Sequence, residues 1–161
     1  MTPIMTEELA LPDAAATRRL GAALATGIAP GRVLYLSGDL GSGKTTLVQG
    51  LLRELGVPGR VKSPTYSLVE LYELSSLNFY HFDFYRFTDR SEWEASGFRH
   101  YFTPATACVV EWPERAGGLI AAPDLQVSLT YAGGGRSARL TACSTPGRAW
   151  LAAALKRWSQ A

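Results

Sequence analysis

The stretch GDLGSGKT, residues 38–45, decides the fold class of this chain. It satisfies the pattern G-x-x-x-x-G-K-[ST], follows the hydrophobic run RVLYLSG (residues 32–38), and opens a helical spacing of apolar residues that ends at Gly56. Glycines allow the backbone to turn so that successive N–H groups and a helix N-terminus face phosphates. Lys44 would then reach the β- and γ-phosphates, and the Thr45 hydroxyl would coordinate Mg²⁺. The sequence therefore predicts a nucleotide-binding P-loop between a buried strand and an amphipathic helix.

Outward from the P-loop, the spacing of apolar residues predicts an α/β chain. A helix begins after Asp13 and runs to about Gly27, and a last helix begins at Thr145. Strands are predicted for residues 66–74, 79–87, 107–112, 125–131 and 138–142. The first two strands read as a hairpin joined at Ser75-Ser76, and the last two as a hairpin around three glycines. We expect a three-layer P-loop NTPase-like fold with a mixed sheet of parallel strands and antiparallel hairpins.

Two acidic residues are candidate partners of the P-loop. Glu111 closes the apolar run ACVVE, and P-loop enzymes carry a metal-side carboxylate at the end of such a strand. Asp83 lies in the aromatic run YHFDFYRF, where His81, Asp83 and Tyr85 share one strand face. Spacing alone leaves two interpretations open for Asp83. It faces the γ-phosphate and the attacking water, or it forms an ion pair with Arg86 or another arginine.

Composition limits the function classes. The 161 residues, 47% hydrophobic and 19% charged, fit a single domain over residues 1–161. A net charge of +2 without basic runs gives no support for direct binding of nucleic acid. Cys108 and Cys143 lack metal-ligand spacing and are expected to be free thiols. No leader or membrane span is indicated, so we expect a cytoplasmic protein.

Four blocks in order resemble one family over nearly the whole chain: GDLGSGKTT, SPTYSLVELY, YHFDFYR and VVEWPE. They are similar to the TsaE (YjeE) proteins, the P-loop ATPases of bacterial tRNA threonylcarbamoyladenosine (t6A) biosynthesis. The resemblance implies binding of ATP or ADP with Mg²⁺. It also implies an ATPase that is weak alone and stimulated by the TsaD–TsaB complex, with tRNA contacted only through that complex.

The resemblance also implies roles for individual residues. Asp83 matches the family's HxDxYR acid, so Asp83, Lys44 and Glu111 are expected to be catalytic, and Thr45 and Glu111 to hold the metal. The nucleotide is expected to contact Gly38, Asp39, Leu40, Gly41, Ser42, Gly43, Lys44, Thr45, Thr46, Thr65 and Trp112. Thr65 lies in a switch-like segment, Ser63 to Tyr66, and Tyr66 stands where the family often has Phe. His81 and Arg86 are left open as groups that could orient Asp83.

Other functions remain open from the residues. A small-molecule P-loop kinase is the alternative, although the β-rich region after the P-loop differs from the strand–helix alternation of such kinases. A nucleotide-sensing adaptor, in which hydrolysis is incidental, is a third reading. A guanine-specific protein has no support, because the only asparagine, Asn78, is not in an Asn-Lys-x-Asp sequence.

Overall fold

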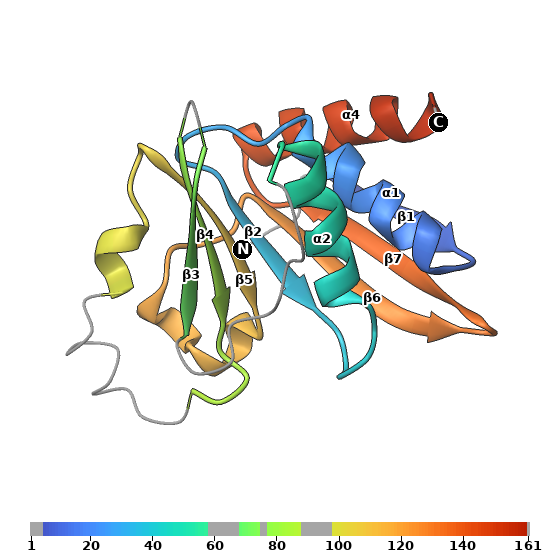
Figure 1. The fold of residues 1–161 in the computed structure, drawn as a ribbon, viewed down its shortest axis with the longest axis horizontal. Coiled ribbons are helices and arrows are strands. Elements are labelled where there is room, and N and C mark those ends of the chain that lie inside the picture. The colour runs from blue at the N-terminus through green and yellow to red at the C-terminus, as the bar shows by residue number, and fades with distance from the viewer. Residues whose placement is uncertain (1–4, 58–67, 75–76, 88–97, 161) are drawn as a thin grey trace.

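One seven-stranded sheet organises the chain in a computed structural model that describes residues 5–57, 68–74, 77–87 and 98–160 (Figure 1). The elements are β1 (Met5–Leu11), α1 (Ala14–Ala25), β2 (Val33–Ser37), α2 (Lys44–Glu54), β3 (Val69–Glu73), β4 (Asn78–Asp83), β5 (Thr106–Glu111), β6 (Leu125–Ala132), β7 (Gly135–Ala142) and α4 (Thr145–Ser159). Three short 3₁₀-helices are η1 (Phe98–Tyr101), η2 (Pro113–Arg115) and η3 (Gly117–Leu119).

The strand order is β1-β7-β6-β2-β5-β4-β3, with β2 at the centre. Strand β2 pairs in parallel with β5 on one side and β6 on the other, and β4 is parallel to β5. The hairpin partners β3 and β7 run antiparallel to β4 and β6. The predicted mixed sheet is confirmed. The carboxyl ends of β2, β4 and β5 therefore meet at one edge, where the P-loop follows β2.

Strand β1 is absent from the sequence-based prediction. It pairs antiparallel with β7 at the sheet edge, in register from Met5 opposite Ala142 to Leu11 opposite Arg136. Most of its side chains are exposed or half-buried, and only Leu11 is fully buried. An edge strand of this kind lacks the regular apolar alternation that sequence patterns detect.

Several predicted boundaries differ from the structure; β7, for example, begins at Gly135 rather than at Ala138. Strand β4 ends at Asp83 rather than Phe87, because the Asp83 carboxylate accepts a hydrogen bond from the N–H of Tyr85 at 3.0 Å and turns the chain. Phe84 lies within this turn and Phe87 beyond it, and both are buried. Helix α1 ends at Ala25, two residues earlier than expected, while Asp13 caps its N-terminus through the Ala16 N–H at 2.8 Å. The link at residues 75–76 lies outside the described residues.

Side chains alternate between two cores on the faces of the sheet. Leu34 and Leu36 of β2 join the larger cluster, to which α1, α2 and α4 contribute, whereas Val33 and Tyr35 join the smaller one. The smaller cluster is covered, within the described ranges, by short 3₁₀-helices and aromatic residues that include Phe82, stacked on Phe102 at 5.0 Å. The sheet is thus the middle of three layers, as predicted.

Helix α2 is held close to α1 by two glycines. A Cβ atom on Gly21 would lie 2.0 Å from the Leu47 carbonyl oxygen, and one on Gly50 would lie 2.1 Å from the Arg18 carbonyl oxygen. Both positions therefore require glycine for backbone-to-backbone packing. This packing fixes the start of α2, and with it the P-loop, against the rest of the molecule.

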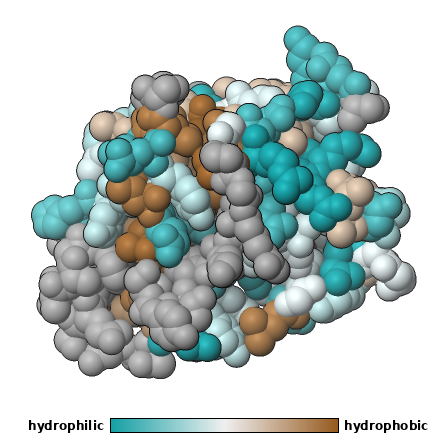
Figure 2. All heavy atoms as spheres, in the orientation of Figure 1, coloured by the Kyte–Doolittle hydropathy of each residue, from teal (hydrophilic) through white to brown (hydrophobic). Residues whose placement is uncertain are grey.

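The surface over α2 is hydrophilic. Figure 2 shows teal residues over and beside this helix, and brown residues gathered over the region of β3 and β4.

No helix in the described ranges is long and apolar enough to cross a membrane. Cys108 and Cys143 are both free, as expected.

Candidate functional site

The P-loop turns where only glycine fits. Gly38 has a φ of +149°, and a Cβ atom there would lie 2.7 Å from the Leu129 carbonyl oxygen. Gly43 has a φ of +110° and is the N-cap of α2, so no side chain caps this helix. The first N–H groups of α2 therefore have no side-chain acceptor at the cap, which is the arrangement that binds phosphate oxygens.

Lys44, the first residue of α2, is folded back over the loop. Its side chain is 6% exposed, and its Nζ atom donates hydrogen bonds to the carbonyl oxygens of Gly38 and Asp39. The ammonium group also lies 4.3 Å from the centre of the Trp112 ring. Burial lowers the pKa of Lys44, while the nearby carboxylates of Glu111 and Asp83 oppose this shift. A buried cation thus stands at the point where the sequence places the β- and γ-phosphates.

Asp83 and Glu111 lie directly opposite each other at the ends of the parallel strands β4 and β5. Asp83 is half-buried and Glu111 is 2% exposed. Burial raises the pKa of Asp83; the hydrogen bond from the Tyr85 N–H lowers it, and the Glu111 carboxylate raises it further. Two acidic groups, one with a raised pKa, therefore face the same loop as Lys44. No ion pair joins Asp83 to Arg86 within the described part of the chain.

His81 supports Glu111 from the neighbouring strand. Its Nε2 atom lies 2.5 Å from the Glu111 Oε2 atom, and the His81 side chain is fully buried. The other ring nitrogen, Nδ1, has no hydrogen-bond partner among the described residues. The open question about His81 therefore has a geometric answer: it contacts Glu111.

These groups share one pocket of about 320 Å³. It is lined by Leu40, Gly41, Ser42, Gly43, Lys44, Thr45, Thr46, Asp83, Tyr85, Glu111 and Trp112. Ten of these eleven residues are predicted site residues, and Tyr85 is the addition. Gly38 and Asp39 do not line the pocket but hold Lys44 through their carbonyl oxygens. Thr65 and its segment lie outside the described residues.

The comparison with protein families matches residues 11–139 to the family described as threonylcarbamoyl adenosine biosynthesis protein TsaE. The chain belongs to the TsaE family. It is therefore a TsaE-family component of tRNA t6A modification, as the four sequence blocks predicted.

Relatives in several organisms support this membership. The TsaE protein of Haemophilus influenzae is 43% identical over 116 residues, which cover 72% of this chain and 73% of that protein. The TsaE protein of Synechocystis is 40% identical, covering 67% of this chain and 71% of that protein. The crystal structure of Bacillus subtilis YdiB superposes with a TM-score of 0.80 at 25% identity, covering 97% of this chain and 98% of that one. The fold described above is thus the fold of a solved structure.

Sequence reasoning missed two residues that hold the P-loop of this TsaE-family chain. The Arg136 guanidinium donates from Nε to the Ser42 carbonyl oxygen and from Nη2 to the Gly41 carbonyl oxygen, each at 3.1 Å. The Tyr131 hydroxyl donates to the Leu40 carbonyl oxygen at 3.1 Å, and its ring lies 4.2 Å from the Arg136 guanidinium. The hairpin of β6 and β7 thereby braces three consecutive P-loop carbonyls. A lone arginine more than 90 residues from the motif offers no sequence signal for this contact.

Trp112 has an unusual backbone beside the pocket. Its φ and ψ of 56° and 48° are left-handed, and it is the only non-glycine residue with positive φ in the described ranges. Its ring lies 5.1 Å from the Tyr85 ring as well as near Lys44. Strained residues of this kind are frequent at functional sites. The turn directs the indole ring to the pocket immediately after Glu111.

The donor set fits a magnesium–nucleotide complex. Mg²⁺ is usually held by one or two carboxylates together with phosphate oxygens, rather than by a cage of protein ligands alone. The described residues contain no cluster of three acidic, histidine or cysteine side chains that could hold a metal. Thr45 and Glu111 would be the side chains near the metal, with the uncapped start of α2 and Lys44 for the phosphates.

Proposed function

We propose that this chain binds and hydrolyses MgATP as the ATPase of the t6A machinery. One observation carries the proposal: the buried Lys44 and the carboxylates of Asp83 and Glu111 line the same pocket beside the P-loop. A fixed cation and uncapped helix N–H groups stabilise charge on the phosphates, which is the main contribution of a protein to phosphoryl transfer.

Each residue has a separate task in this reaction. Lys44 exchanges its present partners, the carbonyl oxygens of Gly38 and Asp39, for phosphate oxygens when the nucleotide binds. Asp83 accepts a hydrogen bond from the attacking water and orients it, and its raised pKa brings it nearer to the range of a general base. Glu111, with Thr45, holds the Mg²⁺, which when bound neutralises charge on the phosphates.

The pocket is open at its rim. Leu40 and Tyr85, which line it, are 60% and 37% exposed. Water is therefore not excluded from the site, and slow hydrolysis by the isolated chain is expected. We propose that the TsaD–TsaB complex docks over this rim and completes the site. We propose also that tRNA is contacted through that complex, since a net charge of +2 without basic runs gives no support for direct binding of nucleic acid.

The test is steady-state ADP release, measured with TsaD and TsaB added singly and together, beside multiple-turnover t6A synthesis. We expect several-fold stimulation only with both partners, and loss of hydrolysis and of t6A synthesis in Lys44→Ala and Thr45→Ala. Arg139→Met, on the same domain but outside the pocket, is the control and should retain both activities. Wild-type rates in the P-loop variants would contradict the assignment.

Two other outcomes would identify the alternatives. ADP release that depends on a small metabolite, with formation of a phosphorylated product, would indicate a small-molecule kinase. Full t6A synthesis with a non-hydrolysable ATP analogue would indicate an adaptor that responds to nucleotide binding alone.

A further inference from the structure

A buried histidine stands behind the metal-side carboxylate of the pocket. His81 lies on β4, two residues before Asp83, and its side chain is fully buried. Its Nε2 atom lies 2.5 Å from the Oε2 atom of Glu111, which ends β5 and lines the pocket together with Lys44. His81 itself does not line the pocket. Glu111 is therefore the side chain through which His81 reaches the site.

The surroundings of the imidazole ring indicate which nitrogen carries the hydrogen. The Nδ1 atom of His81 is buried and has no hydrogen-bond partner among the described residues. In a neutral imidazole one nitrogen is a donor and the other an acceptor. A hydrogen on Nδ1 would bury a donor without an acceptor and turn the lone pair of Nε2 towards the Glu111 carboxylate. A hydrogen on Nε2 instead donates to Oε2, so we assign it there.

This hydrogen bond restrains a carboxylate whose main chain is also fixed. His81 is in register with Val109 and Asp83 with Glu111, so the imidazole reaches diagonally from β4 to the end of β5. The Glu111 carbonyl oxygen accepts a hydrogen bond from the Phe84 N–H at 3.1 Å. A side chain that is held at its backbone and at one carboxylate oxygen has few rotamers left.

We propose that His81 is a positioning residue for Mg²⁺, because its Nε2–H group holds the Glu111 carboxylate in the orientation that the metal requires. This inference rests on the proposed function, in which Glu111 and Thr45 hold the ion. Groups that donate to a metal ligand orient that ligand and set how tightly the metal binds. Mg²⁺ is sensitive to such orientation, since it demands near-octahedral geometry. His81 therefore controls the magnesium-dependent part of nucleotide affinity.

The experiment separates the metal from the nucleotide. Binding of ADP is measured calorimetrically with Mg²⁺ and with EDTA, and the ratio of the two affinities is compared between folded variants. His81→Gln and His81→Met form the matched pair, since their side chains have similar length and only glutamine carries an N–H donor. We expect the wild-type chain to bind ADP more tightly with Mg²⁺. His81→Met should lower the ratio about tenfold, and His81→Gln should retain most of it.

A second comparison asks whether the effect passes through Glu111. Glu111→Gln should itself lower the ratio, and His81→Met should cause no further loss in that background, because the carboxylate that His81 orients is gone. Independent losses in the two variants would contradict a role through Glu111. His81→Asn, whose amide is one methylene shorter than that of glutamine, repeats the measurement so that the result does not depend on the folding of one variant.

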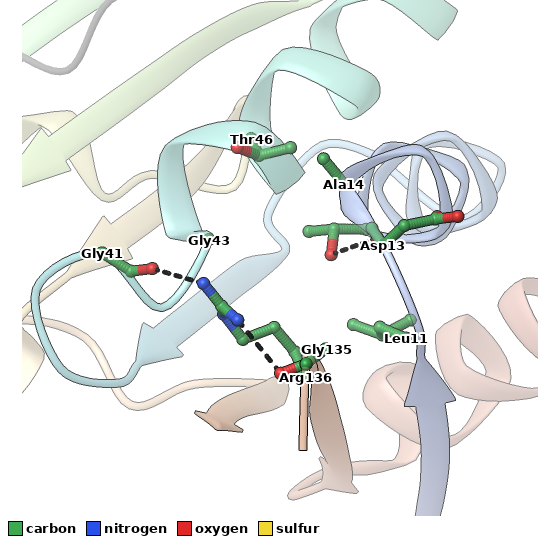
Figure 3. A pocket seen from close by; sticks show the side chains of 10 residues that line it. Leu11, Asp13, Ala14, Gly41, Gly43, Thr46, Gly135 and Arg136 are labelled. Atoms are coloured by element: carbon green, nitrogen blue, oxygen red, sulfur yellow. Dashed lines mark hydrogen bonds between the residues drawn. The ribbon is translucent and has the colours of Figure 1, made fainter. Parts of the chain in front are cut away.

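Two controls lie outside the contact between His81 and Glu111. Figure 3 shows Arg136 bonded to the Gly41 carbonyl oxygen, and Arg136→Met should weaken ADP equally with and without Mg²⁺. Thr106 begins β5, where its hydroxyl donates to the Tyr101 carbonyl oxygen at 2.6 Å. Thr106→Val should lower the stability of the chain and leave the ratio unchanged.

The outcomes distinguish a positioning role from a structural one. An unchanged ratio in both His81→Met and His81→Asn, or equal weakening of ADP with and without Mg²⁺, would overturn the inference and leave the ATPase proposal standing. A wild-type ratio near one would also overturn it, since no magnesium-dependent affinity would then exist. If the wild-type chain bound ADP in neither condition, the proposed function would fall and the positioning role with it.

Discussion

The Nε2 atom of His81 lies 2.5 Å from the Oε2 atom of Glu111, and both side chains are buried. His81 lies two residues before the end of β4, in register with Val109, and reaches diagonally to Glu111 at the end of β5, where Asp83 stands opposite Glu111. Strand β4 thus carries the polar residue His81 in a hydrophobic sheet, because its imidazole contacts the Glu111 carboxylate on the neighbouring strand β5. The side chain that His81 contacts directly is Glu111.

Removal of His81 should destabilise the fold. His81→Leu removes the imidazole from the buried Glu111 carboxylate. Breaking a buried pair in this way costs on the order of 3 kcal/mol. Urea unfolding of His81→Leu, Glu111→Met and the double variant measures the coupling. We expect the double variant to lose less stability than the sum of the two single variants, and additive losses would show that the two side chains do not depend on each other.

Loss of Arg136 should loosen the P-loop without unfolding the chain. Arg136→Met removes two hydrogen bonds to P-loop carbonyls, so we expect about tenfold weaker binding of both MgATP and magnesium tripolyphosphate. Arg136→Lys should restore little of the lost affinity, because a lysine ammonium cannot donate to both carbonyl oxygens in the planar geometry of a guanidinium.

Arg139 provides the matched control for this prediction. It lies on the same strand but forms an exposed ion pair with Glu8, with 63% and 59% of the two side chains accessible. Such pairs contribute little to stability, so Arg139→Met should leave both affinities unchanged. Tripolyphosphate binding that is the same in Arg136→Met and in the wild type would show that the P-loop keeps its shape without this arginine.

Asp83→Asn should stabilise the nucleotide-free protein at neutral pH. The pKa of Asp83 is raised by burial, so the folded state binds more protons than the unfolded state between the ordinary and the raised pKa. Stability conferred by the protonated form is therefore lost as pH rises through this window. The side-chain oxygen of asparagine can still accept the hydrogen bond from the Tyr85 N–H, and asparagine carries no charge.

Thermal unfolding between about pH 4 and pH 8 tests whether the stability contributed by Asp83 falls as pH rises, since the window begins near the ordinary aspartate pKa. The melting temperature of Asp83→Asn should exceed that of the wild type by an amount that grows with pH, while ATP hydrolysis falls far more than ATP affinity. A melting temperature lowered at every pH would assign Asp83 a structural role instead.

Trp112 should report nucleotide binding. Its ring contacts the Lys44 ammonium at 4.3 Å, and Lys44 must turn towards the phosphates when the nucleotide binds. We therefore expect a change of tryptophan fluorescence on titration with MgATP that disappears in Trp112→Phe. Trp158→Phe, which removes an indole stacked under Arg19 at 3.8 Å outside the pocket, should retain the change. A signal that survives in Trp112→Phe would place the responding group elsewhere.

Four sequence blocks indicated the family by resemblance. The sequence by itself also determined the central strand, the P-loop and helix α2. These features rest on local physics: glycines where φ is positive, a lysine and a hydroxyl at fixed spacing, and an apolar periodicity that belongs to one element at a time. Glu111 was predicted from its place at the end of an apolar strand beside the P-loop. Spacing alone left the role of Asp83 open, and its assignment rested on the resemblance to the family.

Only the tertiary structure decided which distant groups touch. Strand β1 is too exposed to show a pattern, and it becomes a strand because β7 offers it hydrogen-bond partners. Tyr131 and Arg136 reach P-loop carbonyls from a hairpin formed more than 90 residues later. His81 meets Glu111 because β4 and β5 pair in a particular register. Such contacts depend on strand order and register, which many segments fix jointly, so no single stretch of sequence encodes them.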